Sequence, residues 1–242
     1  MASEYAFSIH PQPDDRTCGP TCLHAVYLHY GDEIPLERVV TEVPQLPTGG
    51  TLGVMLACHA LRRGYRATLL TYNLEVFDPT WFGEGAPPVE ERLRAQRKAK
   101  ASRKLREASR AYLEFLELGG ELAMQDLSPS LLSRPLARGV PLLTGLSSTF
   151  LYRAKRETPE GTDDDVRGIP MGHFVVLVGY DARRREVLLA DPYLPNPMAR
   201  GHLYTQPIAR VITSILLGVL TYDANVLLIE PAATRRPRGA AA

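Results

Sequence analysis

Residues 172–191 constrain the fold more than any other part of the chain. This segment consists of two apolar runs, GHFVVLVGYD and EVLLAD, which are joined by the polar sequence ARRR. Two apolar runs around a short polar turn predict a β-hairpin. The chain therefore contains an antiparallel pair of strands, with His173 near the start of the first strand and Asp191 at the end of the second.

The register of this hairpin decides whether its histidine and aspartate lie on one face. If residues 181–185 form the loop, Tyr180 pairs with Glu186, and His173 and Asp191 become diagonal neighbours. Diagonal neighbours on one face have backbones about 7–8 Å apart, within side-chain reach. A loop one residue longer or shorter would place the two side chains on opposite faces. The hairpin thus predicts a His–Asp pair that depends on the register.

A cysteine stands at the start of a predicted helix near the N-terminus. Gly19 and Pro20 suit the first turn, residues 21–30 place apolar side chains along one face, and Gly31 supplies a stop. Unpaired amide N–H groups at a helix N-terminus stabilise negative charge. The position of Cys18 therefore favours a reactive thiolate.

The rest of the chain mixes short helices and strands. Helices are predicted at 35–43, at 51–63 with Thr51 as cap and Gly64 as stop, at 128–138 with Ser128 as cap and Gly139 as stop, and at 208–216. Strands are predicted at 66–72, 140–146 and 224–231, and a polar loop at 155–169. These elements predict an α+β fold.

Residues 79–125 differ in composition from their surroundings. A turn rich in Pro and Gly leads into a strongly basic helical run. The second half of this run carries an apolar stripe, whereas the first half has little beyond Leu93, so we expect the first half to project into solvent. We predict one domain over 1–232, with 79–125 as a basic helical insertion, and a disordered tail over 233–242.

Composition excludes several classes of protein. The 242 residues have 45% hydrophobic content and a formal net charge of +1, which gives one sizeable core and no general case for nucleic acid. Three cysteines cannot form a disulfide framework. The N-terminus shows no secretory signal, and the longest apolar stretch, 211–220, is too short to cross a bilayer. We expect a cytoplasmic protein.

The chain offers one candidate for each part of a cysteine nucleophile site. Such a site needs a base, a group that orients the base, and donors for the oxyanion that forms on the attacked carbonyl. Cys18 is the candidate nucleophile, His173 the base and Asp191 the orienting group. Gln12 donates from an uncharged amide a few residues before the cysteine, so it is the candidate oxyanion donor, together with the cysteine N–H.

Alternatives to these assignments remain open. Asp181 or Asn196 could orient the histidine instead of Asp191, because an Asp-Pro pair is also a common turn. Cys18 could be an ordinary buried cysteine, and Cys22 could be its redox partner, although Cys22 and Cys58 are expected in the core. The spacing of Cys18 and Cys22 has no matching downstream pair for zinc, so no metal or cofactor site is predicted.

Four motifs together resemble a known family. They are Gln12, the residues DRTCGP at 15–20, GHFVVL at 172–177 and DP at 191–192. In this order they resemble the papain-like cysteine peptidases, specifically the bacteriocin-processing (double-glycine leader) peptidases and their stand-alone relatives. The resemblance implies a helix carrying the cysteine packed on an antiparallel sheet carrying the histidine. It also implies a peptide or protein substrate and the four roles assigned above.

The sequence departs from that family in two respects. The best-known members are fused to a membrane transporter and cut after two glycines, whereas this chain has no membrane segment, so substrate choice does not carry over. The basic run from Arg92 to Arg110 looks like an insertion relative to a minimal peptidase. Most such runs are solvated faces. A functional alternative is that this one binds an acidic partner or tail, or a membrane surface.

Four functions follow from these patterns. The first is hydrolysis of a peptide or isopeptide bond through a Cys18 acyl-enzyme. The second is transfer of the same acyl group to an amine. The third is a peptidase-like domain that only binds a peptide. The fourth, nucleic-acid binding through the basic run, lacks the aromatic residues that stack on bases and is unfavoured.

Overall fold

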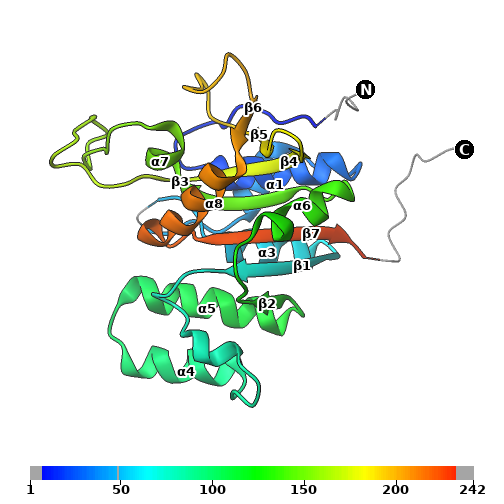
Figure 1. The fold of residues 1–242 in the computed structure, drawn as a ribbon. Coiled ribbons are helices and arrows are strands. Elements are labelled where there is room, and N and C mark those ends of the chain that lie inside the picture. The colour runs from blue at the N-terminus through cyan, green and yellow to red at the C-terminus, as the bar shows by residue number, and fades with distance from the viewer. Residues whose placement is uncertain (1–6, 48, 233–242) are drawn as a thin grey trace, which may run out of the picture.

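The protein is a three-layer structure in which helices cover both faces of a seven-stranded sheet (Figure 1). The computed structural model describes residues 7–47 and 49–232, so the predicted tail at 233–242 lies outside the described residues. One face of the sheet is covered by α1 (Cys18–His29), α2 (Leu36–Glu42) and α3 (Gly53–Arg62). The other face is covered by α6 (Pro129–Ala137), α7 (Ser148–Tyr152) and α8 (Ile208–Leu217).

The sheet is antiparallel except at one edge. Its strands, in spatial order, are β2 (Glu121–Ala123), β1 (Tyr65–Thr71), β7 (Asn225–Pro231), β3 (Leu142–Ser147), β4 (Gly172–Asp181), β5 (Glu186–Ala190) and β6 (Leu203–Pro207). Within residues 7–47 and 49–232, β1 and β2 are the only two neighbouring strands that pair in parallel. The α+β prediction is confirmed. The apolar run of β4 is buried from both sides, which is why it lacks alternation.

The predicted hairpin forms, but its turn differs from the prediction by one residue. Asp181, not Tyr180, pairs with Glu186, so the loop spans 182–185. A β-bulge between Leu177 and Gly179 then shifts the register, and Val176 pairs with Ala190. A bulge adds one residue to one strand. The extra residue therefore cancels the error in the loop and returns the far end of the hairpin to the predicted register.

Most predicted helix ends are confirmed, and one cap is wrong. The Ser128 side chain caps α6 by accepting from the Leu131 N–H. Gly64 has the left-handed φ of +84° that ends a helix without strain. Thr51, however, does not cap α3, because Leu52 occupies the N-cap and the Thr51 hydroxyl donates to the Pro44 carbonyl. This hydrogen bond joins the two ends of the loop between α2 and α3.

The segment 79–125 forms a short 3-10 helix η1 (Pro79–Phe82), then α4 (Val89–Ala99), α5 (Arg103–Glu117) and the edge strand β2. The basic run is thus two helices. The expectation that its first half projects into solvent is wrong for one face of α4, which packs along α5 and fully buries Leu93, whereas most of its other side chains are exposed (Figure 1). The Gln96 side chain also donates to the Val76 carbonyl. The apolar contact of Leu93 and this hydrogen bond help to hold a helix whose packing the weak periodicity did not predict.

None of the helices within residues 7–47 and 49–232 combines the length and the apolar character needed to cross a membrane.

Candidate active site

Cys18 is the first residue of α1 and is half-buried beside the sheet. The next residue, Gly19, explains how the start of the helix comes so close to its neighbours. A Cβ atom at Gly19 would lie 2.7 Å from Thr51 Cγ2 and 3.2 Å from the Phe174 ring. Phe174 follows His173 on β4, so the glycine lets the cysteine end of α1 approach the histidine strand.

His173 and Asp191 form a buried pair at the end of the hairpin. The distance between His173 Nε2 and Asp191 Oδ1 is 2.8 Å. The same oxygen accepts the backbone N–H of Tyr193 at 3.0 Å. Asp191 is completely buried and His173 is 7% exposed. Because Nε2 is used by the aspartate, Nδ1 is the ring nitrogen left for a thiol.

Two tyrosines that the sequence did not single out complete the shell of Asp191. The hydroxyls of Tyr152 and Tyr204 each donate to Asp191 Oδ2 at 2.7 Å. Tyr152 ends the short helix α7 and Tyr204 lies on β6, so neither is near the aspartate in sequence. No local pattern could identify them. Together with His173 and the Tyr193 N–H, they give this carboxylate four hydrogen-bond partners.

Charge and burial act in opposite directions on this pair. Burial alone would lower the pKa of His173, but the charge and hydrogen bond of Asp191 and the interaction with Cys18 outweigh it, so the pKa is raised above its ordinary value. Burial alone would raise the pKa of Asp191, but the charge and hydrogen bond of His173 and the bonds from Tyr204 and Tyr193 lower it. The pair is therefore stable as imidazolium and carboxylate.

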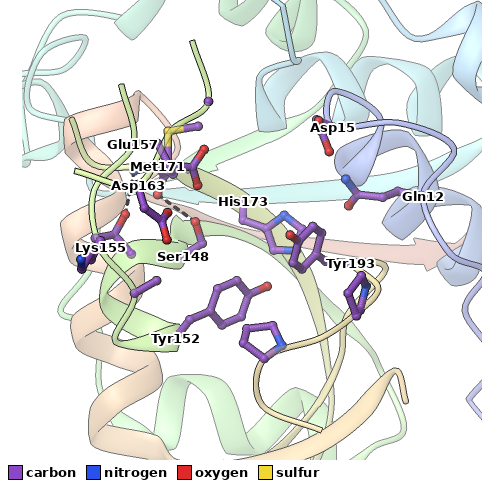
Figure 2. A pocket seen from close by; sticks show the side chains of 16 residues that line it. Gln12, Asp15, Ser148, Tyr152, Lys155, Glu157, Asp163, Met171, His173 and Tyr193 are labelled. Carbon is purple, nitrogen blue, oxygen red and sulfur yellow. Dashed lines mark hydrogen bonds between the residues drawn. The ribbon is translucent and has the colours of Figure 1, made fainter. Parts of the chain in front are cut away.

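Two hollows meet at His173 and form the candidate substrate cleft. One, of about 520 Å³, is lined by Cys18, His173 and the 157–161 loop. The other, of about 480 Å³, also borders the histidine and is lined by Gln12, Ser148, Tyr152 and Tyr193 (Figure 2). An extended chain could cross both hollows.

The polar segment 155–169 is a folded flap over this cleft. Glu157 and Ile169 exchange both backbone hydrogen bonds, and a turn at Thr158 closes through the Gly161 N–H. Glu157 and Gly161 line both hollows. The predicted loop therefore has a short ladder of its own and forms one wall of the cleft.

Gln12 lies across the cleft from Tyr152, on the far side of His173 (Figure 2). Its backbone N–H donates to the Pro192 carbonyl at 2.9 Å, which ties it to the segment that follows Asp191. Its Nε2 donates to the Asp14 carbonyl at 2.8 Å. An amide nitrogen carries two hydrogens, so one remains for a ligand.

Among the described residues, neither of the other two candidates is a recorded hydrogen-bond partner of His173. Asp181 accepts the N–H groups of Arg183 and Arg184 in the hairpin loop. Asn196 accepts the Met198 N–H, and its side chain interacts with Tyr204 of the Asp191 shell. Asp191 is thus the carboxylate in contact with the histidine, as the register argument favoured.

The remaining two cysteines are core residues, as predicted. Cys22 is fully buried and its thiol donates to the Phe174 carbonyl at 3.2 Å. Burial raises its pKa well above the ordinary value, which keeps it a thiol. Cys58 is buried against α5, and burial raises its pKa to about 12. All three cysteines are free.

The chain is similar in fold to solved peptidases. The peptidase domain of Streptococcus ComA, a bifunctional ABC transporter involved in quorum sensing, has 12% identity and a TM-score of 0.43, with 93% of this chain and 99% of that chain covered. A protein described as a C39-like peptidase from Bacillus anthracis has 14% identity and a TM-score of 0.48, with 94% and 96% covered. Xylellain, a cysteine protease from Xylella fastidiosa, has 15% identity and a TM-score of 0.41, with 94% and 84% covered.

No protein-family model and no curated protein matches the chain. The similarity to the solved peptidases concerns the overall fold, and no assignment of a residue or an activity rests on it. The support for the candidate site is therefore the set of contacts described above.

Proposed function

We propose that the protein is a cysteine peptidase that hydrolyses a peptide or isopeptide bond through a Cys18 acyl-enzyme. The observation that carries the proposal is the buried contact between His173 and Asp191 in the cleft that Cys18 also lines. A buried histidine with a raised pKa and a carboxylate behind it suits a thiolate–imidazolium pair. The motif resemblance described above points to the same chemistry.

The first half of the reaction forms the acyl-enzyme. The Cys18 thiolate attacks the carbonyl carbon, and the carbonyl π electrons move to oxygen. Gln12 Nε2–H and the Cys18 backbone N–H, which has no partner within the helix, stabilise that oxyanion. When the intermediate collapses, the C–N bond breaks and the proton on His173 Nδ1 passes to the leaving amine. A thioester and neutral His173 remain.

The second half releases the acid. His173 removes a proton from water, the resulting hydroxide attacks the thioester carbonyl, and the C–S bond breaks. The thiolate and imidazolium are restored together with a carboxylic acid product. Asp191 stays ionised throughout and holds the ring in one orientation, with Tyr152 and Tyr204 fixing its other oxygen.

Replacing Cys18 with alanine tests this proposal directly. We expect cleavage of a peptide library to fall by about 10⁴-fold or more, because no other group supplies the nucleophile. Labelling by a thiol-directed peptide electrophile should also disappear, as measured by intact-protein mass spectrometry.

Cys58→Ala is the matched control, since it also removes one thiol but lies in the core away from the cleft. It should retain both cleavage and labelling. Unchanged labelling of the Cys18→Ala protein, in a sample whose thermal melt shows that it is folded, would remove the basis for the assignment.

A further inference from the structure

A buried carboxyl group that the reaction does not use lines the cleft close to the candidate catalytic residues. Asp223 lies between the 3-10 helix η2 (Gly218–Thr221) and β7, and its backbone N–H donates to the Gly218 carbonyl. It is 8% exposed and lines the same hollow as Cys18 and His173. Its Oδ1 has no hydrogen-bond partner among the described residues. A buried oxygen without a partner is costly, so this one requires an explanation.

Two glycines on neighbouring strands make room for this side chain. A Cβ atom at Gly145 would lie 2.6 Å from Asp223 Cβ, and one at Gly172 would lie 3.2 Å from Asp223 Oδ2. Gly172 directly precedes His173, so the Asp223 carboxyl group packs against the residue next to the histidine. The carboxyl is therefore at the base of the cleft and not on an outer rim.

The charge of Lys104 acts on this carboxyl but does not neutralise it. Lys104, on α5, is the residue of the 79–125 insertion that lines the hollow. Its ammonium lies 4.2 Å from the centre of the Tyr222 ring, in a cation–π contact. Burial raises the pKa of Asp223 to about 8, and the charge of Lys104 opposes that rise only in part.

Other carboxyl groups line the same hollow as Asp223. They are Asp15, Glu157 and Glu160, and they lie beside Arg16, Lys104 and the His173 imidazolium. A lysine or arginine side chain that entered this hollow would therefore meet further carboxylates besides Asp223.

We propose that Asp223 is the base of a subsite for a lysine or arginine side chain of the peptide substrate. A cationic head would supply the hydrogen bonds and the charge that the buried carboxyl lacks. The methylene stem of such a side chain would occupy the cleft between the flap and the start of α1. This inference rests on the proposed peptidase function, because the subsite is useful only if a peptide crosses the cleft.

Peptide Michael acceptors that extend on both sides of the reactive carbon test the subsite. Each position in turn carries lysine, arginine, norleucine or glutamine, and the second-order rate of labelling of Cys18 is measured for each probe. We expect lysine or arginine at one position to react at least tenfold faster than norleucine and glutamine, as a charge-assisted hydrogen bond implies. In Asp223→Asn that ratio should fall to within about twofold.

Controls separate this result from a general change of charge or fold. Glu33→Gln also removes one negative charge, but from an exposed site away from the cleft, and it should keep the full ratio. Lys104→Met removes the competing cation and should keep or increase the ratio. If Asp223→Asn does not fold, Asp223→Ser makes the same test.

Two results would overturn the subsite. One is the absence of any preference for a basic residue in the native protein, and the other is an unchanged preference in Asp223→Asn. Labelling needs only the thiol and a bound peptide, so the ratio can be read even if no peptide is hydrolysed. Conversely, hydrolysis without a basic preference would leave the peptidase proposal intact and reject the subsite alone.

Discussion

Replacing His173 with alanine is expected to lower kcat/KM for a cleaved peptide by about 10³-fold or more, because the variant has no group to protonate the leaving amine or to activate water. Alkylation of Cys18 by iodoacetamide at pH 6 should also slow by about tenfold or more. The reason is that the imidazolium, held by Asp191 at 2.8 Å, no longer stabilises the thiolate. Peptide hydrolysis and the alkylation rate are measured separately.

His29→Ala is the matched control for this change. His29 is an exposed histidine on the same helix as Cys18, and it contacts the Gly139 carbonyl far from the cleft. It should leave both rates within about twofold of the native values. A His173→Ala protein with native turnover would show that His173 is a core residue and not the base.

Replacing Asp191 with asparagine should reduce the free energy of unfolding at pH 7 by about 3 kcal/mol, since breaking a buried charge pair leaves the other charge uncompensated. The change also removes the charge on the acceptor of the Tyr152 and Tyr204 hydroxyls. The folded-state pKa of Asp191 is lowered, to about 2 from 3.8. Its contribution to stability is therefore present above pH 4 and is lost as the pH falls through about 2.

Denaturant titrations of the native and variant proteins between pH 2 and pH 7 measure this difference. It should be greatest near neutral pH and shrink at the acidic end. Asp181→Asn is the control, because Asp181 accepts two backbone N–H groups in the exposed hairpin loop, and its loss should cost under about 1 kcal/mol. Equal losses for the two variants, or a loss for Asp191→Asn that persists at pH 2, would contradict the assigned pairing.

The sequence predicted that His173 and Asp191 form a pair, but it did not predict the exact backbone of the hairpin that connects them. Two apolar runs around a polar turn predicted the hairpin. The pairing of its strands then placed His173 and Asp191 on the same face. The loop was predicted with one residue too many and the bulge was not predicted, and the two errors cancelled. A bulge in a uniformly apolar run leaves no periodic signal, because every residue of that run is buried.

Other parts of the site had no local signal at all. Tyr152 belongs to a five-residue helix that follows β3, too short for a helical pattern. Asp223 has the sequence context of an ordinary turn residue before the last strand, and its burial depends on the two glycines on β3 and β4 that make room for it. Both positions depend on contacts between segments far apart in sequence, which propensity and spacing do not encode.

The basic segment 79–125, predicted to be an insertion, illustrates the same limit. Its amphipathic second half was predicted and forms α5, but the packing of α4 on α5 through Leu93 was not. Several of its charges are used within the protein, such as Arg94 with Glu117 and Arg103 with Glu107. Binding of an acidic partner by the stretch from Arg92 to Arg110 stays a prediction.

The bulge next to Val178 also affects how related sequences should be aligned. Here the histidine and the aspartate are 18 positions apart, an even number, and the hairpin loop of 182–185 also has an even number of residues. If the bulge residue were absent and the loop had the same length, a histidine and an aspartate in the same diagonal arrangement would be an odd number of sequence positions apart. A search that fixes this interval would miss homologues with a regular strand, and an alignment gap belongs at the bulge, between the histidine and the turn.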